Sequence, residues 1–123
     1  MIANSKLITF IPTRDAARAR IFYEELLGLT FVSDDGFALI MDVNGILLRI
    51  TRVGEFTPYP FTVLGWLVPD IETAVVTLTA KGVAFTTFSF LKHDDLGIWS
   101  APDGAKVAWF LDPDGNTLSL SQK

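Results

Sequence analysis

The feature that most constrains the fold is a pattern that occurs twice along the chain. An aspartate opens a helical stretch that ends at a glycine, at Asp15 to Gly28 and again at Asp70 to Gly82, and a phenylalanine follows each glycine three residues later. The stretches DVNGILLRI (42–50) and DPDGNTLSL (112–120) also match, with Asp and Gly three positions apart in both. Similar elements repeated in the same order indicate a duplicated structural unit.

Each copy is predicted to be a βαβββ unit. Apolar, β-branched or alternating runs predict the strands, Asp is a good helix N-cap, and Gly readily adopts the left-handed conformation that ends a helix. In the first copy we expect a strand at 7–11 that Pro12 ends, a helix at 15–28 with an Arg20–Glu24 pair, and strands at 29–33, 37–42 and 46–53. In the second we expect a strand at 62–68, a helix opened by Pro69 and Asp70, and strands at 83–88, 107–112 and 117–121, with a longer segment at 89–105.

The fold class that follows is α+β, in one domain that covers residues 1–123. A single curved sheet with one helix leaves its other face uncovered, so two modules are needed. The first module is expected at about 6–53 and the second at about 62–123, joined by a linker at about 54–61 that carries Gly and Pro breaks. A chain of 123 residues suits one domain of this kind.

Composition excludes several classes of function. The net charge is −4 and no basic run is present, so nucleic acid is not an expected partner. The chain has no cysteine, which removes thiolate metal sites, thiol nucleophiles and disulfides. No apolar stretch approaches the ~20 residues that span a bilayer, and the apolar run near the N-terminus is too short for a signal peptide. We therefore expect a soluble, cytoplasmic protein without a membrane partner.

The closing strand of each copy alternates between two faces. One face is purely apolar and should pack on the helices; it holds Ile46, Leu48 and Ile50 in the first copy, and Leu118 and Leu120 in the second. The other face is mixed and should line an enclosed space or meet solvent; it holds Leu47, Arg49 and Thr51, and then Thr117, Ser119 and Ser121. Arg49 and Ser119 occupy matching places, four residues after Gly45 and Gly115.

At this point the chain resembles the vicinal oxygen chelate superfamily, which includes lactoylglutathione lyase (glyoxalase), extradiol dioxygenases, fosfomycin-resistance enzymes and bleomycin-resistance proteins. The segments that carry the resemblance are FIPTRDAARARIFYEELLGLTF, GWLVPDIETAVVTLTAKGVAF and AWFLDPDGNTLSL. The resemblance implies two βαβββ modules that form a cupped mixed sheet, usually in a homodimer.

The metalloenzymes of that superfamily hold a divalent metal at four cup-facing positions, usually filled by His and Glu. The resemblance places these positions at Ile8, Arg49, Val63 (Leu64 if the register slips by one) and Ser119. None is a histidine or a carboxylate, and a guanidinium would repel a cation. We therefore expect no metal and no cofactor.

The expected ligand is a small molecule held in the cup, and no catalytic residue is assigned. Arg49 could hold a carboxylate or phosphate, or could equally be solvated or paired with an acidic neighbour. Most aromatic side chains should be core, although Phe88 and Phe90 share a strand face and Trp99 lies in the long segment. His93 is expected to be a solvated loop residue. The candidate ligand-binding residues are Ile8, Phe10, Arg49, Val63, Phe88, Phe90, Trp99, Trp109 and Ser119.

Three functions remain open from the sequence. The first is a metal-free small-molecule-binding protein similar to the bleomycin-resistance proteins. The second is a glyoxalase-like lyase or isomerase, or a dioxygenase-type enzyme, with a divergent site. The third is a scaffold whose dimer surface is its function. Net negative charge suits a cationic or neutral ligand while Arg49 suits an anionic one, so the charge of the ligand stays open.

Overall fold

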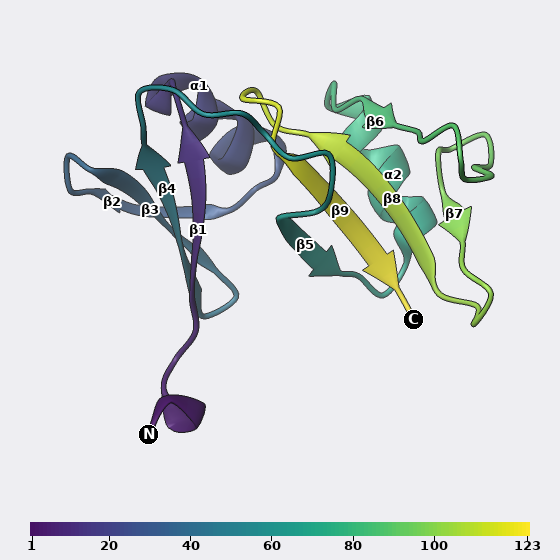
Figure 1. Ribbon diagram of the computed structural model, residues 1–123, viewed down its shortest axis with the longest axis horizontal. Helices are drawn as coiled ribbons and strands as arrows, with labels where there is room; N and C mark the ends of the chain where they lie inside the picture. Colours follow the sequence, from purple (N-terminus) through teal and green to yellow (C-terminus); the bar gives the residue numbers. More distant parts are fainter. The chain divides into compact units, whose positions relative to one another are not determined.

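The computed structural model describes all residues from Met1 to Lys123, which divide into two compact units, Met1–Thr57 and Pro58–Lys123. The first unit contains η1 (Ile2–Asn4), β1 (Ile8–Thr13), α1 (Ala16–Arg20), η2 (Ile21–Leu26), β2 (Thr30–Asp34), β3 (Ala38–Val43) and β4 (Ile46–Arg52) (Figure 1). The second contains β5 (Leu64–Leu67), α2 (Ile71–Ala80), β6 (Phe85–Thr86), β7 (Trp99–Ser100), β8 (Lys106–Leu111) and β9 (Thr117–Gln122). The predicted α+β class and the two βαβββ modules are confirmed; the exact linker limits stay a prediction.

The first unit is a mixed four-stranded sheet in the order β1-β4-β3-β2, with α1 packed against β4 and β3. β1 runs parallel to β4, while the other neighbours are antiparallel. The predicted apolar face of β4 is confirmed at its centre, where Leu48 and Ile50 are fully buried. The other large core residues of this unit are Ile11, Phe22, Tyr23, Leu39 and Met41.

Pro12 does not end the first strand, as the sequence suggested, but lies inside β1 and pairs with Thr51 of β4. β1 is an edge strand of its sheet, so the missing N–H of proline can face away from the ladder. Within this strand Ile8 and Phe10 are exposed, while Ile11 is buried.

The first helix begins where predicted, since the Asp15 side chain accepts a hydrogen bond from the Arg18 N–H. Its second half is wound more widely, as the π-helix η2, which the periodicity of the sequence did not reveal. The predicted Arg20–Glu24 pair is present at 3.0 Å, and Gly28 ends the segment with φ +76°. No helix of the chain has the length and apolar character needed to cross a membrane.

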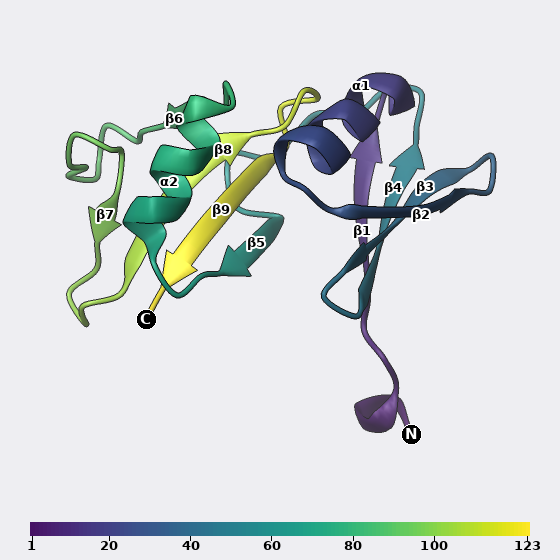
Figure 2. The ribbon, with the colours of Figure 1, turned by 180° about the vertical axis from the view of Figure 1, so that it is seen from behind.

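The second unit repeats the same topology, with β5 parallel to β9 and the order β5-β9-β8-β6. α2 covers one face of β8 and β9 (Figure 2). It is capped by Asp70, whose carboxylate accepts from the N–H and hydroxyl of Thr73. The core between helix and sheet is made of Ile71, Val75, Val83, Ile98, Ala108, Phe110, Leu118 and Leu120.

Two strand predictions in the second unit were wrong in extent, and one further strand was not predicted. The run 62–68 forms strand only at Leu64–Leu67, and 83–88 only at Phe85–Thr86. The segment 89–105, predicted without a strand, contains β7, which pairs with β8. A local hydrogen bond competes with a longer β6, because the Phe88 N–H at the end of the predicted strand donates to His93 Nε2.

The closing turn between β8 and β9 is built as the sequence predicted, by aspartate. Asp112 Oδ1 accepts from the backbone N–H groups of Asp114 and Asn116, both at 2.9 Å, and its Oδ2 accepts from the Asn116 amide at 2.8 Å. Gly115 supplies the positive φ, +89°, that the turn requires. The turn fixes the register in which β9 returns beside β8.

Candidate ligand-binding site

Ser119 lies at the centre of the mixed face of the second unit. Cross-strand partners point to the same face of a sheet, and Ser119 pairs with Gly65 on β5 and with Trp109 on β8. Leu118 and Leu120 point to the opposite face and are buried with α2. The predicted alternation of β9 is therefore correct, and because Ser119 is only 5% exposed, it does not meet solvent, which was one of the two alternatives expected for the mixed face.

An aromatic cluster stands over Trp109 on this face. The Phe88 ring packs edge-on against Trp109 with centroids 5.1 Å apart, and Trp99 lies 6.1 Å from Trp109. The indole N–H of Trp109 donates to Thr62 Oγ1 at 3.1 Å. Phe90 lies 5.5 Å from Phe88 and is exposed. The structure thus brings together the four aromatic residues singled out in this half, although Phe88 and Phe90 lie beyond β6 and not on a strand.

His93 is part of this cluster and is not the solvated loop residue expected from the sequence. Its Nε2 accepts from the Phe88 N–H at 3.0 Å, so Nδ1 carries the proton and donates to the Gly97 carbonyl at 2.8 Å. The ring also lies 5.8 Å from Trp109. Both ring nitrogens have a structural partner, and the imidazole fixes Phe88 in place.

A groove of about 280 Å³ opens beside Phe88 on the same face. Leu111 and Thr117 are cross-strand partners that lie two residues along β8 and β9 from Trp109 and Ser119, so they point to the same face of the sheet. Both residues line this groove. The full lining is Pro58, Tyr59, Pro60, Thr86, Phe88, Leu111, Gly115 and Thr117. No charged side chain is among these residues.

The segment before β5 forms part of the groove and is tied to the sheet. Thr117 Oγ1 donates to the Tyr59 carbonyl at 3.1 Å, and the Val63 N–H donates to the Thr117 carbonyl at 3.0 Å. A Cβ added to Gly115 would stand 3.3 Å from the Pro58 ring, so proline and turn are in close contact. Sequence reasoning treated Pro58 to Pro60 only as linker; their contribution depends on long-range contacts that no local pattern encodes.

Val63 is placed less centrally than predicted. It precedes β5, and the residue that pairs with Ser119 is Gly65. A side chain at that position would collide, since a Cβ on Gly65 would come within 2.9 Å of Ser119 Oγ. The centre of this face is therefore occupied by Ser119 and the Trp109 ring.

In the first unit, the cross-strand partners of Arg49 on β4 are Phe10 of β1 and Ile40 of β3. Arg49 Nη2 lies 2.9 Å from Asp35 Oδ2. Arg49 is therefore paired with an acidic neighbour, which was one of the alternatives that the sequence left open. Ile8 lies in the adjacent row, beside Leu47, and Phe10 is 60% exposed. A ligand carboxylate would share this guanidinium with Asp35, because the contact with Asp35 is through Nη2 and the Arg49 side chain is 26% exposed.

The carboxylate of Asp35 is itself held firmly. Its Oδ1 accepts from the backbone N–H groups of Ala38 at 2.8 Å and Phe37 at 2.9 Å. These two bonds, followed by that from Arg49, hold the pKa of Asp35 below its usual value. Arg49 is thus engaged by a carboxylate that belongs to the chain.

The four positions that the resemblance assigns to metal ligands do not fit a divalent cation. Ile8 and Val63 offer no donor atom, Arg49 is cationic, and Ser119 offers only a hydroxyl. Across the chain, no three His, Cys, Asp or Glu side chains gather closely enough to hold a metal ion.

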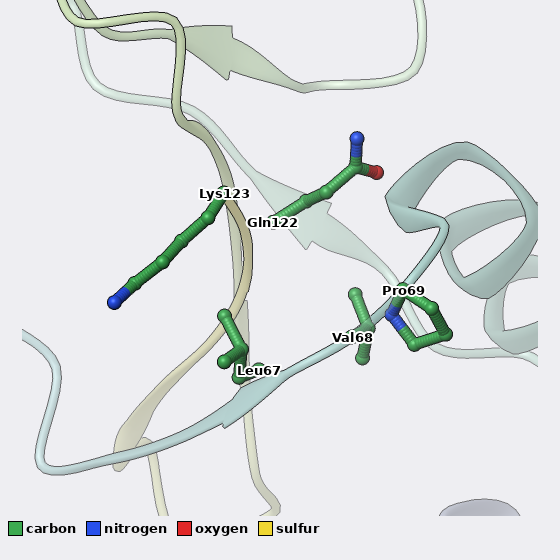
Figure 3. A pocket seen from close by; sticks show the side chains of 5 residues that line it. All are labelled: Leu67, Val68, Pro69, Gln122 and Lys123. Atoms are coloured by element: carbon green, nitrogen blue, oxygen red, sulfur yellow. The ribbon is translucent and has the colours of Figure 1, made fainter.

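A second groove, of about 350 Å³, lies beside the C-terminal end of β9 and is lined by Leu67, Val68, Pro69, Gln122 and Lys123 (Figure 3). The polar end of Gln122 is already used, because its Oε1 accepts from the Ile71 N–H at 2.8 Å and caps α2. This groove holds none of the predicted site residues.

Comparison with known proteins places the chain by its fold. No model of a protein family and no curated protein matches the sequence. A solved member of the glyoxalase/bleomycin resistance protein/dioxygenase superfamily from Sphaerobacter thermophilus DSM 20745 aligns over 100% of both chains with a TM-score of 0.78 and 24% identity. A glyoxalase/bleomycin resistance protein/dioxygenase from Alicyclobacillus acidocaldarius aligns over 97% of this chain and 91% of its own (TM-score 0.73, 21% identity).

A lactoylglutathione lyase from Agrobacterium tumefaciens also aligns, over 97% of this chain and 93% of its own, with a TM-score of 0.72 and 16% identity. The matches extend over almost the whole length of each protein, so they include both βαβββ modules. The chain therefore has the fold of the glyoxalase/bleomycin resistance protein/dioxygenase superfamily, as the resemblance in its sequence predicted.

Proposed function

We propose that this chain is a metal-free small-molecule-binding protein of the glyoxalase/bleomycin resistance superfamily, and that the groove of the second unit holds its ligand. The observation that carries the proposal is the groove of about 280 Å³ on the mixed sheet face, with Phe88 in its lining. Small-molecule sites are typically concave and largely apolar, with a few placed polar groups. The prolines, Phe88 and Leu111 supply the apolar surface, and Thr86 and Thr117 supply hydroxyl groups.

The chemistry of the lining favours binding over catalysis. General acid–base or nucleophilic catalysis needs a titratable or activated group at the reacting atoms. The groove offers no carboxylate, imidazole, amine or thiol, and its one titratable side chain is the Tyr59 phenol, whose ring stacks on Phe61. The nearby imidazole of His93 has both nitrogens engaged by Phe88 and Gly97.

A rigid support makes the proposed site suitable for binding without rearrangement. Phe88 is held by the His93 acceptor on its backbone and by the Trp109 ring on its side chain. Trp109 is held in turn by Thr62. Side chains fixed before the ligand arrives lose little conformational entropy on binding. We propose Trp99 and Trp109 as this support and Phe90 as a residue at its exposed margin.

The remaining predicted properties belong to the same proposal. Ile8, Phe10 and Arg49 stay candidate ligand contacts of the first unit, and Val63 and Ser119 of the second.

We further propose a homodimer in the cytoplasm. Sedimentation would identify the dimer, and elemental analysis of protein purified without chelator should find no stoichiometric divalent metal. A stoichiometric metal would instead favour the lyase or dioxygenase alternative.

The test is a fragment screen by NMR on the ¹⁵N-labelled chain. Binders should shift the amide signals of Thr86, Gly115 and Thr117, and Leu111→Glu should abolish these shifts. Leu111 is 47% exposed, so the charge can be accommodated without unfolding. Val76→Glu is the matched control, because Val76 is 54% exposed on α2, away from the groove. A screen that never shifts these amides, or shifts that survive Leu111→Glu, would refute the site.

A further inference from the structure

The groove lining has a composition that selects among ligands by charge and shape. It contains two proline rings and two aromatic rings, with Leu111 beside them. Tyr59, which is 62% exposed, stacks on Phe61 with centroids 5.1 Å apart and planes 13° from parallel. Aromatic rings present flat surfaces, and flat apolar surfaces pack best against a planar ligand.

The polar groups of the groove are neutral. Thr117 Oγ1 already donates its proton to the Tyr59 carbonyl, and a hydroxyl retains lone pairs that can accept. Thr86 carries a second hydroxyl. A ligand that donates one hydrogen bond would therefore find an acceptor in Thr117, while the Thr86 and Tyr59 hydroxyls can donate as well as accept.

Nothing in the lining would compensate a ligand charge. The ionisable residues that adjoin the lining along the chain are Asp112, after Leu111, and Asp114, before Gly115. Asp112 uses both carboxylate oxygens within its own turn. A charge that loses hydration in the groove without gaining a partner costs free energy, so we expect both anions and cations to be disfavoured.

We infer that the groove takes uncharged, planar aromatic molecules that carry a hydrogen-bond donor, of the hydroxyarene class. This inference rests on the proposed function, because it names the ligand class of the same groove. It assigns the selection for neutral ligands to Leu111 and to the neutral residues around it, and the hydrogen bond to the Thr117 hydroxyl.

The test uses three probes that share one ring system: 2-naphthol, 2-naphthoate and protonated 2-naphthylmethylamine. Titrations at pH 7, followed by the amide signals of Thr86, Gly115 and Thr117, should give a Kd for 2-naphthol at least about tenfold lower than for either charged probe. Leu111→Lys should reverse the order of 2-naphthol and 2-naphthoate by supplying a cation. Val76→Lys should leave the order unchanged.

The outcomes separate this inference from the proposed function. If a charged probe binds at these amides as tightly as 2-naphthol, the ligand class is wrong and the groove remains the site. If none of the three probes binds there but other fragments do, the planar class is wrong. If no fragment of any kind shifts these amides, the groove is not a ligand site, and both proposals fail.

Discussion

Arg52 binds Asp34 through two parallel hydrogen bonds, with Nη1 2.8 Å from Oδ1 and Nη2 2.7 Å from Oδ2. The pair joins the end of β4 to the end of β2, two strands that are separated by β3 in the sheet. The bond from Arg52, followed by the N–H of Gly36, lowers the pKa of Asp34 from 3.8 to about 2. This two-pronged geometry suits a guanidinium and cannot be reproduced by lysine.

The first prediction is a contribution of this pair to stability that is lost in acid. Because the pKa of Asp34 is lower in the folded chain, the unfolded chain binds more protons between pH 3.8 and about 2. The contribution is therefore complete above pH 3.8 and disappears as the pH falls through about 2. Urea unfolding of wild type and Arg52→Gln from pH 6 to pH 1.5 should show midpoints that differ at pH 6 and converge in acid. A difference that persists unchanged at pH 1.5 would contradict this account.

The second prediction concerns the close approach of β5 to β9. A Cβ at Gly65 would lie 2.9 Å from Ser119 Oγ and 3.3 Å from the Ser119 carbonyl oxygen. Gly65 is itself exposed, but the Ser119 atoms that a Cβ would meet are buried, so Gly65→Ala should destabilise the chain by about 1 kcal/mol, the lower end of the range for overpacked sites. Chemical denaturation measures the change.

A double-mutant cycle identifies the colliding atom. Adding Ser119→Ala removes Oγ and should recover part of the loss caused by Gly65→Ala, since only the contact with the carbonyl remains. Gly54→Ala is the control, because a Cβ at that position meets no atom within 4 Å. Strictly additive effects at positions 65 and 119 would show that the loss has another origin.

The sequence was sufficient to predict the duplicated architecture because its signals are local. Caps at Asp15 and Asp70, glycines at the helix ends and the turn at Asp112 to Gly115 each act within a few residues. The alternation of β4 and β9 correctly predicted which side chains face the helices.

The site was harder to predict because it is assembled over long range. His93 binds Phe88 through the backbone, Thr62 accepts from Trp109, and Thr117 donates to Tyr59. The last two bonds join residues far apart in sequence, and no periodicity marks them. Likewise, Arg49 matched Ser119 in the repeat, but the sequence could not show that Arg49 pairs with the Asp35 carboxylate.

The third prediction separates the contributors to the Asp35 pKa. The N–H groups of Ala38 and Phe37 are larger causes of its lowered pKa than Arg49. In Arg49→Ala the pKa of Asp35 should therefore rise but stay below 3.8, as a carboxyl ¹³C titration would show. A full return to 3.8 would mean that Arg49 is the dominant cause.

The fourth prediction assigns His93 a role in fixing Phe88. His93→Ala removes the acceptor of the Phe88 N–H, and a lost hydrogen bond is worth about 0.5–1.5 kcal/mol. Hydrogen exchange of the Phe88 amide should accelerate by up to about tenfold, and fragment binding in the groove should weaken because the ring is no longer held. Lys92→Ala is the control, since Lys92 is the exposed neighbour of His93. If exchange at Phe88 is unchanged in His93→Ala, the imidazole does not fix this residue. In that case the rigid support proposed for the groove would rest on the Trp109 ring alone.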